Sequence, residues 1–163
     1  MKARDLAQQL PTIGMDDPAY EAALLIASER LPGLAVFSSD GRPVTVLPAS
    51  DALRAVIPEP IQDDPSLAGV IDEQGAEACA DELGRKRVRD LIRPRRHRVE
   101  LAVVDGDDTV LECAAVMARL RSPLLVVTDR ADRDRVLGLL TASRLLATLL
   151  DRLPKPEGQA STK

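Results

Sequence analysis

The feature that most constrains the fold is that the sequence repeats itself. Residues 3–6 recur as 88–91 at an offset of 85, residues 16–23 as 107–114 at 91, and residues 45–53 as 138–146 at 93. Self-similarity at a nearly constant period marks the architectural unit. We therefore expect two diverged copies of one unit, with six residues inserted between the first and second matches.

The first copy opens with a helix. Asp17 is placed to cap it and Pro18 to begin it, and Pro32-Gly33 ends it. An apolar stripe at i, i+3, i+4 and i+7 is typical of such a helix, and its members are Tyr20, Ala23, Leu24 and Ala27.

A hairpin and a second helix follow. The apolar runs 34–37 and 44–47 flank Asp40-Gly41, which predicts two antiparallel strands, and Ser50 can cap a helix over 51–57 that Pro58 closes. The second copy predicts the same order: a helix over 109–120, strands over 124–128 and 136–140, and a helix over 143–150. We take residues 1–57 and 88–152 as the two repeats.

The remaining segments differ in composition. Residues 58–87 carry Asp63-Asp64-Pro65, a cap followed by proline, and broken helical spacing, which predict a linker of one or two helices packed along the side of the pair. Residues 153–163 are rich in Pro, Gly, Ser and Thr, which predicts a disordered tail.

Composition excludes several classes of function. The net charge is -4 and only Tyr20 and Phe37 are aromatic, so general nucleic-acid binding is not expected. No run reaches the ~18 apolar residues that span a bilayer, and we expect a cytoplasmic protein without membrane insertion. Cys79 and Cys113 have no metal-ligand spacing and are interpreted as packed, reduced thiols.

A repeat of extended segment, helix, hairpin and helix, whose second strand runs into Gly-x-x-Thr-x-x-Asp, resembles the CBS domain. Gly138 and Thr141 match this signature in one copy and Asp51 in the other. The resemblance implies a stand-alone, bacterial-type CBS-domain pair (Bateman module): an α+β fold of two βαββα repeats packed through their sheets with pseudo-two-fold symmetry. It also implies clefts between the repeats that hold AMP, ADP, ATP or S-adenosylmethionine.

Simple chemistry accounts for the signature. A carboxylate in the first turn of a helix is stabilised by the helix dipole and can accept both ribose hydroxyls. The signature hydroxyl lies beside the same helix N-terminus, where free backbone N–H groups favour a phosphate. Backbone groups of the edge segments can read the rim of the base, as in similar proteins. The predicted ligand-binding residues are Asp51, Ser50, Thr141 and Arg144, with Ile13, Leu34, Val104 and Leu124 around the base.

Neither copy carries the whole signature. The first has Asp51 but Pro48 in place of the hydroxyl and Thr45 in place of the glycine; the second has Arg144 in place of the carboxylate. A guanidinium donates only, so it can hold an anion but not a diol. We expect at most one ordinary ribose site, beside Asp51; the alternative is that Asp51 only benefits the helix dipole and that Thr141 is only a helix cap.

The inserted residues fall in the basic run 93–98, which holds His97, the only histidine. The run can place guanidinium groups at the cleft to receive phosphates, meet an acidic partner, or form a solvated loop. We expect His97 to be exposed and not catalytic.

No nucleophile, acid–base pair, metal cluster or phosphate-binding loop stands out, and helix capping explains the carboxylate pairs 16–17, 63–64 and 107–108, so an enzyme is not expected. The favoured hypothesis is a regulatory sensor of an adenosyl nucleotide, with no obligatory cofactor, that acts in trans on an unidentified enzyme or transporter. The alternative is a dimerisation or protein-interaction module with a degenerate site. A homodimer is expected in either case.

Overall fold

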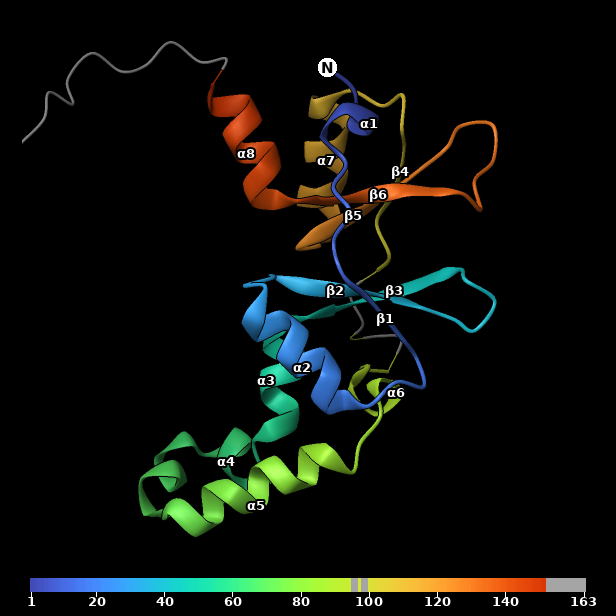
Figure 1. Cartoon of the computed structure of the whole chain (residues 1–163). Coiled ribbons are helices and arrows are strands. Elements are labelled where there is room, and N and C mark those ends of the chain that lie inside the picture. The colour runs from blue at the N-terminus through green and yellow to red at the C-terminus, as the bar shows by residue number, and fades with distance from the viewer. Residues whose placement is uncertain (95–96, 98–99, 152–163) are drawn as a thin grey trace, which may run out of the picture.

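The computed structural model describes residues 1–94, 97 and 100–151, and within them the strands form two three-stranded sheets (Figure 1). In each sheet the first strand is parallel to the second and the second is antiparallel to the third. The strands are β1 (Thr12–Gly14), β2 (Gly33–Phe37) and β3 (Pro43–Pro48), then β4 (Val103–Asp105), β5 (Leu124–Thr128) and β6 (Val136–Thr141). Both hairpins carry a register shift at the equivalent position, after Val36 and after Val127. The two copies therefore fold alike.

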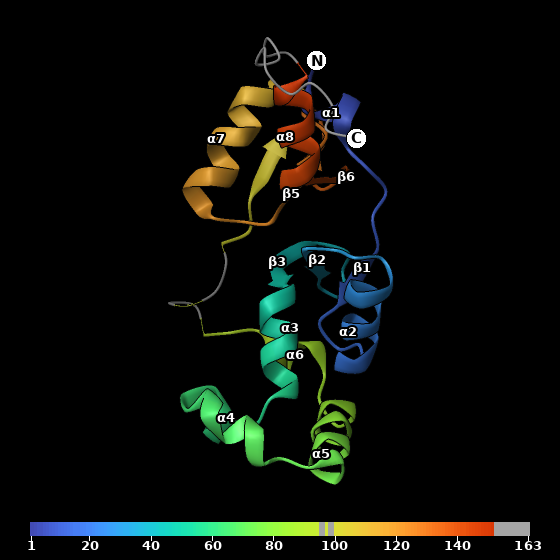
Figure 2. The same ribbon diagram turned by 90° about the vertical axis from the view of Figure 1, so that its left-hand side faces the viewer.

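The repeats pack sheet against sheet, with helices on the outside (Figures 1 and 2). The helices are α2 (Ala19–Ser28) and α3 (Ala49–Val56) on the first sheet, and α7 (Val110–Leu120) and α8 (Ala142–Leu150) on the second. Between the sheets lies a buried aliphatic cluster of Ala35, Val46, Leu124, Val126 and Leu139. The predicted α+β fold of paired repeats is confirmed. None of the helices in the described part is long and apolar enough to cross a membrane.

Two predicted helix caps are wrong. The Asp17 carboxylate accepts the N–H of Gly14 at 2.7 Å and so closes the turn before α2, which is preceded by Pro18 without a side-chain cap. Ser50 lies inside α3 because the helix begins at Ala49, whose N–H donates to the Pro32 carbonyl at 3.0 Å. The first turn of α3 is thus left without a side-chain cap.

The apolar stripe of α2 is not its buried face. Ala19 and Ala22 are fully buried, whereas Tyr20 and Leu24 are 56% and 53% exposed. Two small side chains let the helix axis approach the sheet closely, so the larger side chains remain on the surface.

The linker folds beneath the first repeat as α4 (Glu59–Asp63), a 3-10 turn η1 (Pro65–Val70) and α5 (Glu73–Gly84) (Figure 1). Asp64 caps η1 by accepting the N–H of Ser66 at 3.0 Å, as predicted. Leu83 of α5 is buried in the core of the first repeat. The predicted tail lies outside the described residues.

Each repeat is completed by the segment that precedes the other repeat. The single-turn helix α1 (Ala3–Leu6) packs on the second sheet, and α6 (Val88–Leu91) packs on the first repeat. The backbone contacts match: Ala3 N–H donates to the Asp108 carbonyl at 2.8 Å, and Val88 N–H to the Asp17 carbonyl at 2.9 Å. We call this exchange the reciprocal clasp, defined by residues 2–6 and 87–91.

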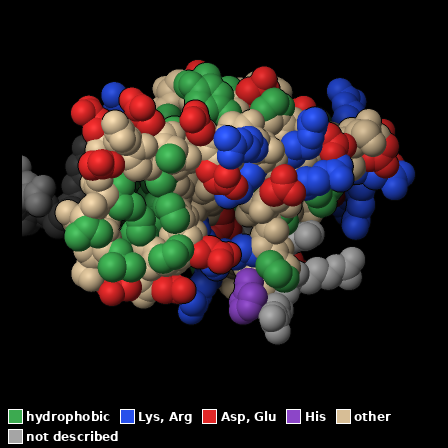
Figure 3. Space-filling view, turned by 90° about the horizontal axis from the view of Figure 1, so that it is seen from below, with side chains coloured by type: hydrophobic (Ala, Val, Ile, Leu, Met, Phe, Trp, Pro, Cys, Tyr) green, Lys and Arg blue, Asp and Glu red, His purple; other side chains and the backbone are tan. Residues whose placement is uncertain are grey.

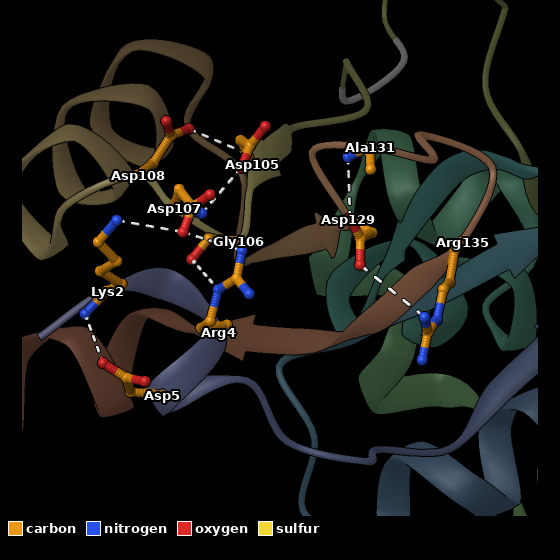
Figure 4. Close-up of polar contacts among 10 residues, drawn as sticks. All are labelled: Lys2, Arg4, Asp5, Asp105, Gly106, Asp107, Asp108, Asp129, Ala131 and Arg135. Atoms are coloured by element: carbon orange, nitrogen blue, oxygen red, sulfur yellow. Dashed lines mark hydrogen bonds and ion pairs between the residues drawn. The ribbon is translucent and has the colours of Figure 1, made fainter.

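Ion pairs fasten the clasp on both sides. Lys2 and Arg4 reach the Asp107 carboxylate at 3.1 and 2.9 Å (Figure 4), and Arg89 pairs in the same way with Asp16. The sequence suggested that the carboxylate pairs at 16–17 and 107–108 cap helices, and this prediction is wrong. The first member of each pair holds the clasp, and the second closes a turn.

The clasp makes stability depend on pH through Asp107. A hydrogen bond from Lys2 lowers the pKa of Asp107 below its ordinary 3.8; partial desolvation opposes this shift and the Arg4 charge adds to it. A carboxyl group with a lowered folded-state pKa stabilises the protein above its unfolded-state pKa, and this contribution is lost as pH falls through the folded-state pKa. We expect Asp107→Asn to lower the urea midpoint at pH 7, and the difference from the parent protein to be smaller at pH 3 than at pH 7.

Asp81→Asn is the matched control, since Asp81 is exposed on α5 and forms no ion pair with a described residue. It should leave the midpoint unchanged at both pH values. A loss for Asp107→Asn that is equally large at pH 7 and at pH 3 would contradict the clasp.

Candidate functional site

The predicted ribose ligand Asp51 is already paired. It lies in the first turn of α3 with its side chain only 11% exposed, and its Oδ1 is 2.9 Å from Nε of Arg93. The Arg93 N–H is not directed at the oxygen, so the contact is an ion pair without a hydrogen bond, and this buried Nε has no hydrogen-bond partner among the described residues. No described donor hydrogen-bonds to the Asp51 carboxylate either, so it retains its capacity to accept.

A cavity of about 850 Å³ is lined by both residues of this pair and by the C-terminal part of α3. Its walls come from α3, the linker helices and the segment from α6 to Pro94, so this cavity lies beside the first repeat and not in the predicted cleft between the repeats. Charged side chains in the wall are Asp51, Arg54, Glu59, Glu82, Lys86, Asp90 and Arg93. A smaller hollow of about 370 Å³ adjoins it and is lined by Ser50, Leu53, Arg54, Ile57, Gln62, Asp63 and Arg93. Figure 3 shows the underside of the molecule, where acidic and basic side chains mix beside a hydrophobic surface.

Gln62 joins α4 to the end of α3. Its Nε2 donates to the carbonyls of Ile57 and Arg54 at 2.6 and 3.0 Å, which are acceptors that a helix end leaves open. Its Oε1 accepts from Nε of Arg54. No carboxylate in the described part lies within ion-pair distance of Arg54, so its charge is available to a ligand. Sequence analysis missed Arg54, Gln62 and Lys86 because the linker pattern does not say which face of α3 it covers.

The four residues predicted around the base are core residues. Ile13 and Leu34 are buried in the first core, Val104 in the second, and Leu124 between the sheets. Their side chains are therefore occupied, and only backbone groups of these segments are left for a ligand, as the resemblance implied. Ser50 is exposed and adjoins the Asp51 site, whereas Thr141 and Arg144 belong to the other repeat.

In the second repeat the signature residues have structural partners. Thr141 caps α8 by accepting the N–H of Arg144 at 3.3 Å, and Arg144 is exposed. Gly138 has φ +155°, and Gln8 of the N-terminal segment forms a two-way backbone bridge with the next residue, Leu139, at 2.8 and 2.9 Å. A Cβ at Gly138 would lie 2.8 Å from the Gln8 carbonyl oxygen, so the glycine lets this segment approach β6.

The basic run is only partly described. Arg93 forms an ion pair with Asp51 in the wall of the cavity beside the first repeat. His97 is exposed, as expected, and Arg95, Arg96 and Arg98 lie outside the described residues.

The two cysteines are unpaired, which fits their interpretation as packed thiols. Cys113 is fully buried, and desolvation raises the pKa of its thiol to about 11. Cys79 is half-buried in the wall of the cavity. In the described part of the chain, no three His, Cys, Asp or Glu side chains lie close enough together to hold a metal ion.

Replacing Gly138 tests the close approach of the N-terminal segment. Gly138→Ala should lower the free energy of unfolding by about 1–3 kcal/mol, since the new methyl group meets the Gln8 carbonyl and the backbone lies in a region strained for alanine. Urea denaturation measures the loss. Gly84→Ala is the control: no atom lies within 4 Å of the point where its Cβ would stand, and the change in stability should stay within about 0.5 kcal/mol. Equal stability of the two variants would refute the steric role of Gly138.

The family model "CBS domain" matches residues 88–151. No curated protein matches the chain. A CBS domain-containing protein of unknown function from Kribbella flavida is 49% identical, with a TM-score of 0.79, and the match covers 92% of this chain and 99% of that one.

More distant structures share the fold. CBSX2, a CBS-pair protein of Arabidopsis thaliana, was solved in complex with AMP; it is 18% identical with a TM-score of 0.61, and the match covers 92% of this chain and 96% of that one. The CBS domain pair of MJ0100, in complex with 5-methylthioadenosine and S-adenosyl-L-methionine, is 16% identical with a TM-score of 0.63, over 94% of this chain and 98% of that one. With a 49% identical relative aligned over almost its whole length, and with the same paired sheets, the chain belongs to the family of CBS domain-containing proteins.

Proposed function

We propose that this protein is a cytoplasmic regulatory module that binds an adenosyl nucleotide beside Asp51 and acts in trans on a partner enzyme or transporter. The observation that carries the proposal is the state of Asp51: a nearly buried carboxylate in the first turn of α3, in the wall of a cavity, to which no described donor hydrogen-bonds. CBS pairs of the same fold have been solved with AMP and with S-adenosyl-L-methionine, which supports the ligand class. The unpaired thiols fit a reducing compartment.

The chemistry of Asp51 suits a ribose. A carboxylate accepts both hydroxyls of a vicinal diol, and each hydrogen bond to a charged group contributes roughly 1.5–3 kcal/mol in a site that excludes water. The first turn of α3 has no side-chain cap, so its free N–H groups add to the attraction for an anionic ligand.

The second repeat is less suited to the same ligand. The position equivalent to Asp51 is Arg144, which is exposed and has no oxygen to accept from a diol. The N-terminus of α8 is already capped by Thr141. We therefore assign the ribose to the Asp51 side alone.

The outer helices support a homodimer. Tyr20 of α2 and Leu53 of α3 are exposed, and so are their equivalents in the second repeat, Leu111 of α7 and Leu146 of α8, at 56% to 70%. These four helices form one face of the molecule (Figure 2). Large apolar side chains that stay exposed at the same positions in both copies suit a two-fold interface, which would cover both sets at once.

The same face favours a second candidate function. If the split signature means that the ligand site is degenerate, the protein is a dimerisation or interaction module that works through these helices without a ligand. Ligand binding separates the two functions.

Thermal unfolding with AMP, ADP, ATP and S-adenosylmethionine tests the ligand site. A ligand that binds only the folded protein stabilises it by about 2.7 kcal/mol at 100 times its Kd, which corresponds to a rise in Tm of about 5–10 °C for a chain of this size. Asp51→Ala should abolish the rise, since it removes the acceptor of the ribose hydroxyls.

Glu21→Ala is the matched control, because it removes a carboxylate from the first turn of the neighbouring helix α2. The shift should survive in this variant. Unchanged Tm with all four ligands would leave the interaction module as the function, and a shift that persists in Asp51→Ala would refute the ribose assignment.

The oligomeric state tests the outer face. Sedimentation equilibrium should give a dimer for the parent chain and a monomer for the Leu111→Glu/Leu146→Glu double variant, because the introduced charges would be buried in the interface. Val70→Glu, at an 82% exposed position of the linker, should remain a dimer. A monomeric parent chain, or a double variant that still dimerises, would rule out this interface.

A further inference from the structure

The linker exposes a group of apolar side chains. Leu67 and Val70 of η1 are 40% and 82% exposed, Ile71, which follows them, is 37% exposed, and η1 contains no buried residue. Figure 3 views the molecule from below, and on the left of this view hydrophobic side chains gather with acidic side chains around them. An apolar patch with a polar rim is typical of a surface that binds another molecule.

This part of the linker is fastened to the first repeat. Gln62 hydrogen-bonds to the end of α3, and Leu83 of α5 is buried in the core of the first repeat. Ile71 packs on α5, where a Cβ at Gly75 would lie 2.6 Å from Cγ2 of Ile71. The apolar side chains therefore belong to a preformed surface, and a partner need not order the linker in order to bind.

The charges of the linker indicate which partner fits. Residues 59–84 hold eight Asp or Glu residues and no Lys or Arg. Asp64 and Asp72 cap η1 and α5. Glu82 pairs with Arg85 and Lys86 at the end of α5. The other five carboxylates are exposed and form no hydrogen bond or ion pair with a described residue: Glu59, Asp63, Glu73, Glu77 and Asp81.

Three of these carboxylates form a row along α5. Glu73, Glu77 and Asp81 are spaced by four residues, so they lie on one side of the helix. The opposite side faces the cavity with Gly75 and Cys79. Like charges at this spacing repel each other and destabilise a helix. A row of basic side chains from another molecule would relieve this repulsion.

We propose that the linker binds a basic amphipathic helix of a partner protein. The binding site, which we call the linker surface, is defined by Leu67, Val70, Glu73, Glu77 and Asp81. The two apolar side chains contact the apolar face of the partner helix, and the row on α5, about 12 Å long at 1.5 Å per residue, pairs with its Lys or Arg side chains. A small polycation would leave the apolar side chains uncovered.

The linker surface is separate from the face assigned to the homodimer. That face is formed by α2, α3, α7 and α8, whereas the linker lies beneath the first repeat (Figures 1 and 2). A partner on the linker surface therefore leaves the outer helices free for a second copy. The inference goes beyond the proposed function and needs no ligand beside Asp51, so either can fail without the other.

Fluorescence anisotropy of the full chain with a labelled peptide tests the linker surface. The probe is a peptide of about 18 residues of Leu, Lys and Ala, long enough to be helical, with Lys at every fourth position and Leu beside one end of this row. A second peptide has the same composition with Leu and Lys spread around the helix. The parent chain should bind the first peptide roughly tenfold more tightly, and its affinity should fall as salt is added.

Two variants separate charge from apolar contact. Glu73→Gln/Glu77→Gln/Asp81→Asn should weaken binding roughly tenfold, because it removes the three ion pairs, while the urea midpoint stays close to that of the parent protein. Val70→Glu adds a carboxylate and removes an apolar contact. A purely electrostatic contact would become tighter in this variant, whereas binding to the linker surface should weaken by roughly threefold or more.

The matched control is Glu29→Gln/Glu100→Gln/Asp151→Asn, which changes the net charge equally at exposed carboxylates outside the linker, and it should bind like the parent chain. Equal binding of the two peptides, binding of neither, undiminished binding in the α5 triple variant or in Val70→Glu, or an equal loss in the control would each overturn the linker surface. Sedimentation equilibrium should give the parent chain and the α5 variant the same mass; a larger mass for the parent would mean that a second copy occupies the surface, which also overturns the proposal. The adenosyl site, tested by its own shift in Tm, stands in each case.

Discussion

The architecture depends on the reciprocal clasp between the repeats. Each three-stranded sheet has an outer face that two helices cover incompletely, and the remaining apolar positions are filled by Leu6 or Leu91 from the segment that precedes the other repeat. Backbone hydrogen bonds and the carboxylates of Asp16 and Asp107 hold these segments in place. Neither core is complete without a contribution from the other half of the chain, and this is why the pair behaves as one unit.

The clasp also makes the two halves of the site unequal. At the second repeat the segment after α1 lies against β6, where Gly138 admits it. At the first repeat the equivalent position is Thr45, and the segment after α6 carries Arg93 onto Asp51 instead. The connection from α6 to β4 is six residues longer than the connection from α1 to β1. One substitution and one insertion thus leave a symmetrical fold with a carboxylate and a guanidinium paired on a single side.

Much of the fold could be predicted from the sequence because the copies repeat the same order of periodicities, and the hairpins, the outer helices and the packing of sheet on sheet follow from that order. Details set by long-range contacts could not. Asp17 looked like a cap because it precedes a helix, but it closes a turn; Tyr20 and Leu24 looked like a core stripe, but Ala19 and Ala22 face the sheet.

The candidate site was predicted less completely. Asp51 follows from the signature, but its partner does not, because nothing in the basic run says which arginine reaches the cleft. The cavity wall depends on the linker helices, whose position against α3 is fixed by the tertiary hydrogen bonds of Gln62. A crystal structure of the chain with AMP tests the central claim most directly. We predict the ribose hydroxyls on Asp51; AMP bound on the Arg144 side, with the Asp51–Arg93 pair intact, would contradict it.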